Sequence, residues 1–141
     1  MRAQAATFRG AWRPLAGWLA AALHCAACER WTSLQRRARS FLVANNTRFL
    51  ILPQGTGRRC LASRVLGLRL LLLARDWLAL HGHALLLAET LVDSARFQGT
   101  CNCAANWIHL GPIQGRSELE TRYERAVPVK NGYIKPLCTD W

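Results

Sequence analysis

The period of hydrophobic and polar positions changes several times along the first half of the chain. Residues 16 to 31 are rich in alanine, and apolar side chains recur there at helical spacing, at Leu15, Trp18, Leu19, Ala22 and Leu23. This pattern predicts a helix with one apolar face. Two strand-like apolar runs follow, at 41–44 and 48–53, separated by Asn45-Asn46-Thr47. Asparagine tolerates the positive φ angles of tight turns, so the pattern predicts a β-hairpin.

The longest periodic segment begins at Leu61 and ends at Gly82. One stripe of this segment is apolar at Leu66, Leu70, Leu73, Trp77 and Leu80, and further leucines widen the stripe. A helix with so broad an apolar surface is expected to pack against a sheet. The run 84–93 is almost continuously apolar, as in a strand that is covered on both faces. The order strand, helix, strand predicts a parallel pair joined by a crossover.

The last third of the chain predicts smaller elements. Thr100 is a candidate cap for a short helix that extends through Trp107, and Gly111-Pro112 is expected to break the chain. Asn131-Gly132 lies between two apolar runs and predicts a second hairpin. We therefore expect an α/β fold, a mixed sheet with helices packed on it, in one domain that spans residues 15–141 after an N-terminal segment, 1–14.

The charge is strongly positive and unevenly distributed. The net charge is +11, from 17 arginines and 2 lysines against 8 acidic residues, and Glu29 is the only acid before Asp76. Such a field attracts nucleic acid or another polyanion, although arginine-rich composition also accompanies GC-rich codons. The apolar segment from Leu15 to Cys28 is too short to span a bilayer. We expect a cytoplasmic protein with reduced thiols and no membrane partner.

The segment between the predicted hairpin and the long helix has the order strand, glycine-containing loop, helix start. This order presents backbone N–H groups to an anion, here those of Leu61, Ala62, Ser63 and Arg64. Nearby arginines supply a basic face for nucleic acid, at Arg48, Arg58 and Arg59. The loop is neither a Walker motif nor a dinucleotide fingerprint. A plain connection with a basic surface is the alternative.

Three further groups of residues carry candidate chemistry. Glu89 shares a predicted strand face with Leu85, Leu87 and Leu91, so its carboxylate must be paired, have a raised pKa or line a pocket. The alternative is a strand-end position that reaches solvent or a structural arginine.

Cysteine occurs in His24-Cys25-x-x-Cys28 and in Cys101-x-Cys103, but these spacings are weak signatures for zinc and for a catalytic cysteine. We therefore predict no metal site.

Several segments together resemble the DruA family of the Druantia anti-phage defence system, whose domain also occurs beside transposases. The resemblance is carried by NNTRFLILP (45–53), LASRVL (61–66), Asp76-Trp77, LLLAETLVD (85–93), RFQGTC (96–101), AANWIHLG (104–111) and VPVKNGYIKPL (127–137). It covers residues 20 to 137 and corresponds to the C-terminal portion of the family domain. Asn102 and Cys103 replace an aromatic and a basic residue of the family, so the Cys-x-Cys pair is incidental.

The resemblance implies a bacterial protein linked to phage defence or mobile elements, with other defence-system or transposase proteins as partners. The expected order of elements also resembles the cofactor half of GNAT-type acyltransferases, in which a helix N-terminus holds the pyrophosphate of coenzyme A. Leu61, Ala62, Ser63 and Arg64 then bind the cofactor, and Glu89 is the candidate catalytic residue. The function expected first is binding of a phosphate-bearing partner such as DNA. An acyl-coenzyme A-dependent transferase, or a truncated copy without function, remains an alternative.

Overall fold

A mixed sheet of five strands forms the body of the protein in a computed structural model, which describes residues 15–20, 31–51, 59–113 and 129–139. The strands are β1 (Leu15–Ala20), β2 (Val43–Leu50), β3 (Leu87–Asp93), β4 (Ile108–Ile113) and β5 (Lys130–Pro136), in the order β1-β2-β3-β5-β4. β2 and β3 are parallel, and the other neighbours are antiparallel. The predicted α/β class with a mixed sheet is confirmed.

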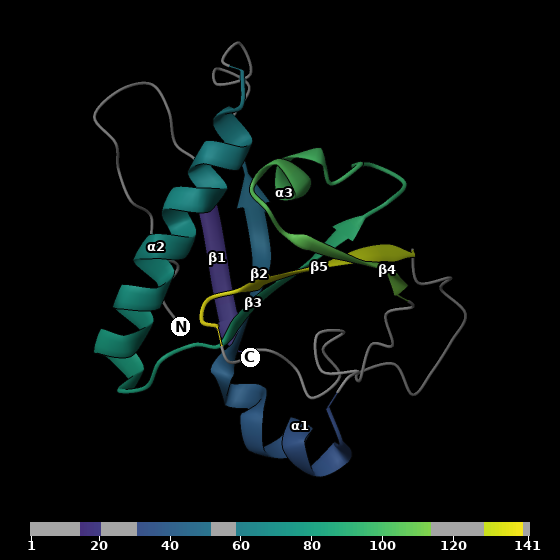
Figure 1. Cartoon of the computed structure of the whole chain (residues 1–141). Helices are drawn as coiled ribbons and strands as arrows, with labels where there is room; N and C mark the ends of the chain where they lie inside the picture. Colours follow the sequence, from purple (N-terminus) through teal and green to yellow (C-terminus); the bar gives the residue numbers. More distant parts are fainter. Residues whose placement is uncertain (1–14, 21–30, 52–58, 114–128, 140–141) are drawn as a thin grey trace, which may run out of the picture.

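The long helix α2 (Leu61–His81) connects the two parallel strands, as the sequence predicts. Gly82 ends the helix in the left-handed conformation with φ 74°, and its N–H donates to the carbonyl of Leu78 at 3.0 Å. α2 ends just before β3 begins, so the end of the helix lies at the amino end of β3. Because β2 and β3 are parallel, the start of the helix lies at the carboxyl ends of both strands (Figure 1).

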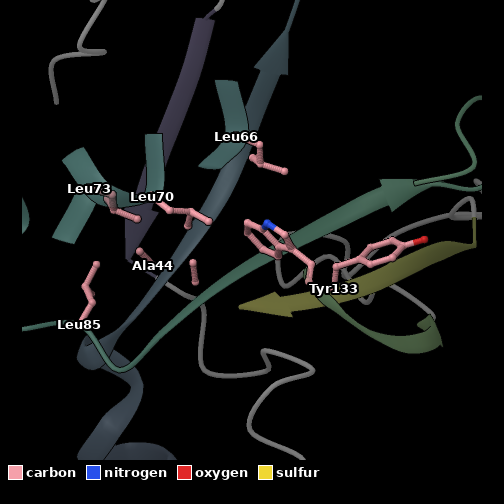
Figure 2. Packing of buried hydrophobic residues seen from close by; sticks show 8 residues of the cluster. Ala44, Leu66, Leu70, Leu73, Leu85 and Tyr133 are labelled. Carbon is pink, nitrogen blue, oxygen red and sulfur yellow. The ribbon is translucent and has the colours of Figure 1, made fainter. Parts of the chain in front are cut away.

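One face of the sheet packs against α2. The cluster on this face joins three leucines of the helix to side chains from the sheet and its connections: Leu66, Leu70, Leu73, Ala44, Leu85, Ala88, Trp107 and Tyr133. In Figure 2 the three helix leucines all point toward the sheet. Because neighbouring strand residues alternate between faces, Val43, Leu87 and Ile134 form a second cluster on the opposite face.

A short helix, α1 (Ser33–Arg39), precedes a 3₁₀ turn, η2 (Ser40–Leu42), and leads into β2. The start of α1 is a capping box, because the Thr32 N–H donates to Gln35 Oε1 at 2.9 Å and the Gln35 N–H donates to Thr32 Oγ1 at 3.3 Å.

The predicted alanine-rich helix is wrong at its beginning, since residues 15–20 form the strand β1. The rest of that prediction falls mostly on residues 21–30, which lie outside the described part.

Both hairpin predictions are wrong. Asn45-Asn46-Thr47 lies inside β2, which pairs with β1 on one side and β3 on the other. Asn131-Gly132 likewise lies inside β5, between β3 and β4. Gly111-Pro112 does not break the chain but lies in β4, where an edge strand accommodates proline. These segments obtain backbone hydrogen bonds from distant strands, and this outweighs their local preference for turns.

Candidate functional site

The N-terminal end of α2 is the part of the fold that the sequence singles out as an anion site. Cys60 is its N-cap, with φ 58°, and makes no side-chain capping hydrogen bond. The first turn contains no acidic residue. The first helical hydrogen bond is donated by the Arg64 N–H to the Cys60 carbonyl at 3.0 Å. The earlier N–H groups, those of Leu61, Ala62 and Ser63, have no partner within a helix, so they can donate to an anion.

The surface around this helix end is basic. Arg59 and Arg64 are both exposed and lie directly before and within the first turn of α2. Ser63 Oγ donates to the Cys60 carbonyl at 3.0 Å, which leaves its oxygen lone pairs but not its proton for a ligand. Arginine side chains beside free N–H groups favour a phosphate or carboxylate here, because the helix dipole and the guanidinium charge have the same sign.

A buried polar side chain lies on the sheet beneath this region. Asn46 is only 6% exposed, and neither its Nδ2 nor its Oδ1 has a hydrogen-bond partner among the described residues. Its cross-strand neighbour Trp18 packs against the cluster that includes Leu66, so Asn46 faces α2. Asn46 lies two residues beyond Ala44 toward the carboxyl end of β2, which is the end where α2 begins.

A second unsatisfied donor belongs to the same layer. Trp107 is buried in the cluster with Leu66, and its Nε1 has no hydrogen-bond partner among the described residues. Thr90, the neighbour of Asn46 on β3, donates its hydroxyl to the Asn46 backbone carbonyl at 3.4 Å and leaves the carboxamide unsatisfied. Buried polar groups without partners are rare, and each costs about 1–3 kcal/mol.

Of the predicted nucleic-acid residues, the structure describes Arg48 and Arg59, and it places them in different parts of the fold. Arg48 is exposed and pairs with Gly17 in β1. The neighbours of Gly17 along β1, Ala16 and Trp18, both face α2. Alternation therefore places Arg48 on the face of the sheet away from α2. Arg59 lies at the helix start, and Arg58 lies outside the described residues. The basic region that the structure supports consists of Arg59 and Arg64.

Glu89, the candidate catalytic residue, lies in the middle of β3 and is only 2% exposed. It shares a face with Leu87, which packs with Val43 and Ile134 in the second cluster. The predicted burial of Glu89 is confirmed, and the alternative of a strand end that reaches solvent is wrong. The predicted shared face is wrong in part, because Leu85 precedes β3 and packs in the cluster on the α2 side, whereas Leu87 packs on the opposite side. The other alternative, a structural arginine partner, stays a prediction. However, its neighbour Ala88 faces α2, so Glu89 faces away from the helix. The structure does not bring Glu89 together with Leu61–Arg64.

The predicted short helix around the Cys-x-Cys pair forms as α3 (Thr100–Ala104), but it ends before Trp107, to which it was expected to extend. Thr100 does not cap this helix: Gly99 is its N-cap, in the left-handed conformation with φ 69°. Cys103 is exposed, and Cys101 is half-buried with its thiol 3.5 Å from Asn102 Oδ1. Burial raises the pKa of the Cys101 thiol above its usual value of 9.0, which makes it a poor nucleophile near neutral pH.

Two further findings concern clustered metal ligands and long apolar helices. Within the described ranges, no three histidine, cysteine or acidic side chains come together in a way that would hold a metal ion. Among the helices of the same ranges, none is long and apolar enough to cross a membrane.

Asn46 is the site residue that sequence reasoning missed, since its place between two apolar runs predicted a turn. The apolar Ala44 two positions earlier is the one signal that Asn46 occupies a strand position facing the core.

The chain matches no protein-family model, and comparisons with curated proteins and with solved structures gave no match.

Proposed function

We propose that the chain is a DruA-like protein, linked to phage defence or mobile elements, that binds a phosphate-bearing partner such as DNA at the start of α2. One observation carries the proposal: α2 begins without a side-chain cap hydrogen bond or an acidic residue, and exposed Arg59 and Arg64 flank the N–H groups of its first turn, which have no partner within the helix. This combination attracts phosphate oxygens through both the helix dipole and formal charge.

The charge of the whole chain supports the same function. A net charge of +11 raises the local concentration of a polyanion around the protein, and the helix start then supplies directed hydrogen bonds. The proposal predicts sequence-independent contacts to the DNA backbone. Fluorescence anisotropy with a labelled duplex, between about 50 and about 200 mM salt, tests it: log affinity should fall linearly with log salt concentration. An affinity that does not change with salt would contradict the proposal.

A second candidate function is favoured by the unsatisfied carboxamide of Asn46 beneath the same helix end. A ligand that carries both phosphate and amide groups would satisfy the helix N–H groups and this buried amide together. Coenzyme A has both, and the observed order strand, helix, parallel strand, short helix supports the GNAT-like hypothesis. A thermal-shift titration with coenzyme A tests this function, and no shift at millimolar ligand removes it.

A further inference from the structure

Phe97 is an exposed aromatic side chain at the edge of the sheet where α2 begins. It lies between β3 and α3, in the connection that leaves the carboxyl end of β3. Because β2 and β3 are parallel, this end lies at the same edge of the sheet as the start of α2. Phe97 is 58% exposed, the largest fraction of any described phenylalanine, tyrosine or tryptophan. An aromatic surface is therefore open to a ligand at the edge that holds the proposed phosphate site.

Hydrogen bonds hold the backbone around Phe97 in one conformation. The carbonyl of Asp93 accepts from the N–H of Phe97 at 2.9 Å and from the N–H of Arg96 at 3.2 Å. The carbonyl of the next residue, Gln98, accepts from the hydroxyl of Tyr133 at 3.4 Å. A ring that projects from an ordered turn loses little conformational entropy when a ligand covers it.

Arg96 covers part of the Phe97 ring. Its Cζ lies 5.5 Å from the ring centroid, within the range of a cation–π contact, and both side chains are exposed. Proteins that bind unpaired bases combine aromatic rings, on which the bases stack, with arginines that add cation–π contacts. In a duplex, neighbouring base pairs already cover the faces of each base. The ring therefore favours a base that is unpaired.

The connection that carries Phe97 is joined to α2 by packing. α3 begins at Thr100 and contacts α2 (Figure 1). Trp107, which follows α3, shares the main cluster with Leu66 in the second turn of α2. The fold therefore holds the Phe97 ring and the N–H groups at the start of α2 in fixed positions relative to one another.

The charge at this edge of the sheet is mostly positive. Arg59, Arg64 and Arg96 are all exposed there. An acid at the same edge, Asp93, accepts a backbone hydrogen bond at 3.0 Å and has Lys130 opposite it in the register of β3 and β5. The edge therefore attracts the phosphate groups of a strand whose base reaches the ring.

We propose that the phosphate-bearing partner is a single-stranded nucleic acid, whose phosphates bind at the start of α2 while one of its unpaired bases stacks on Phe97. This inference rests on the proposed function, which it narrows from nucleic acid in general to strands with unpaired bases. The base supplies the flat face that the ring binds, and the sugar–phosphate chain connects it to the helix start. Single-stranded DNA and single-stranded RNA share this chemistry.

The test measures binding of the full chain by fluorescence anisotropy at several salt concentrations. The labelled ligands are oligothymidine and oligouridine of about 12 nucleotides, an abasic DNA strand of equal length, and a duplex. The variants are Phe97→Ala, Phe97→Tyr, which keeps an aromatic ring, and Phe41→Ala as the matched control. Phe41 is 50% exposed but precedes β2, at the opposite edge of the sheet.

Phe97→Ala should weaken binding of a base-bearing single strand at least about fivefold, which is the smallest loss typical of one base stacked on an aromatic ring. Phe97→Tyr should retain the wild-type affinity, and Phe41→Ala should leave every affinity unchanged. The abasic strand and the duplex should not respond to Phe97→Ala, because neither offers an unpaired base. Stacking releases no counterions, so the slope of log affinity against log salt concentration should stay the same in Phe97→Ala.

The arm with the larger loss, oligothymidine or oligouridine, identifies DNA or RNA as the partner. Circular dichroism of the variants establishes that their folds are intact. Two results overturn the inference and leave the proposed function standing: salt-dependent binding that Phe97→Ala does not change, or an equal loss for the abasic strand and the base-bearing strands. If none of the four ligands binds in a salt-dependent way, the inference and the proposed function both fail.

Discussion

The hydroxyl end of Tyr133 on β5 lies against Gly99, at the start of α3, so closely that a Cβ on residue 99 would overlap the phenol oxygen. The same hydroxyl donates to the carbonyl of Gln98 at 3.4 Å. Gly99 also has φ 69°, a conformation that disfavours other residues. This contact fixes α3 on the end of the sheet, and the cluster that holds Tyr133 also holds Trp107 and Leu66.

Gly99→Ala should therefore be strongly destabilising, and Gly82→Ala is its matched control. Gly82 has a similar φ of 74°, but a Cβ there meets nothing within 4 Å. Gly82→Ala tests backbone strain alone and should cost about 1–2 kcal/mol. Gly99→Ala adds steric overlap, for a further loss of about 1–3 kcal/mol. Chemical denaturation of both variants measures the difference, and equal losses would mean that Tyr133 moves aside freely.

Tyr133 should make the stability of the fold sensitive to alkaline pH. Burial raises the pKa of Tyr133 above its usual value of 10.0, and the nearby Cys103 and Cys101 thiolates raise it further. The unfolded chain then loses the phenol proton before the folded chain does, so stability falls as pH rises through and above 10. Tyr133→Phe removes this contribution.

The measurement is the free energy of unfolding of the wild type and of Tyr133→Phe, from neutral pH to above pH 10. The wild type should lose more stability than the variant over the alkaline range, while the difference between them stays constant below it. Parallel profiles across the whole range would show that the folded environment of Tyr133 does not disfavour its ionisation.

Asn46→Leu should stabilise the protein without ligand. The carboxamide of Asn46 is buried without hydrogen-bond partners among the described residues, so an apolar residue of similar size removes a desolvation cost of about 1–3 kcal/mol. We expect the free energy of unfolding to rise by about 1 kcal/mol. If coenzyme A binds, the variant should also lose its thermal shift with that ligand.

Asn102→Leu is the control for this substitution. Asn102 is buried to the same extent, 6% exposed, but its Oδ1 accepts a hydrogen bond from the Cys101 thiol at 3.5 Å. We expect the control to leave stability unchanged or lower it. A clear loss of stability in Asn46→Leu would contradict the account, since it would mean that the folded protein satisfies this amide.

The sequence predicts the centre of the fold because local and long-range preferences agree there. The leucine stripe of α2, the stop at Gly82 and the apolar run of β3 each indicate the element that forms, and the crossover implies the parallel pair. It does not predict β1, because the leucines and alanines of LAGWLA favour a helix and its apolar residues continue a helical spacing. Pairing with β2 decides its conformation, and no local pattern encodes that partner.

The candidate site is predictable only in part for a similar reason. The loop and helix order indicates the N–H groups of Leu61–Arg64, since that depends on local sequence. Which side of the sheet a residue faces depends on strand register. The register between β1 and β2 shifts between Gly17 and Trp18, and this irregularity places Asn46 toward α2 and Arg48 away from it. Such a bulge leaves little trace in the pattern of hydrophobic positions.

The most direct test of the central claim compares two variants that remove the same charge from different places. Arg59→Ala with Arg64→Ala strips the start of α2, whereas Arg37→Ala with Arg75→Ala strips α1 and the second half of α2. Affinity for a DNA duplex is measured against salt concentration for both. The account predicts that the first pair lowers the log–log slope by about 0.9 for each phosphate that the protein no longer neutralises, while the second pair leaves it near the wild-type value. Equal slopes for the two variants would contradict a phosphate site at the start of α2.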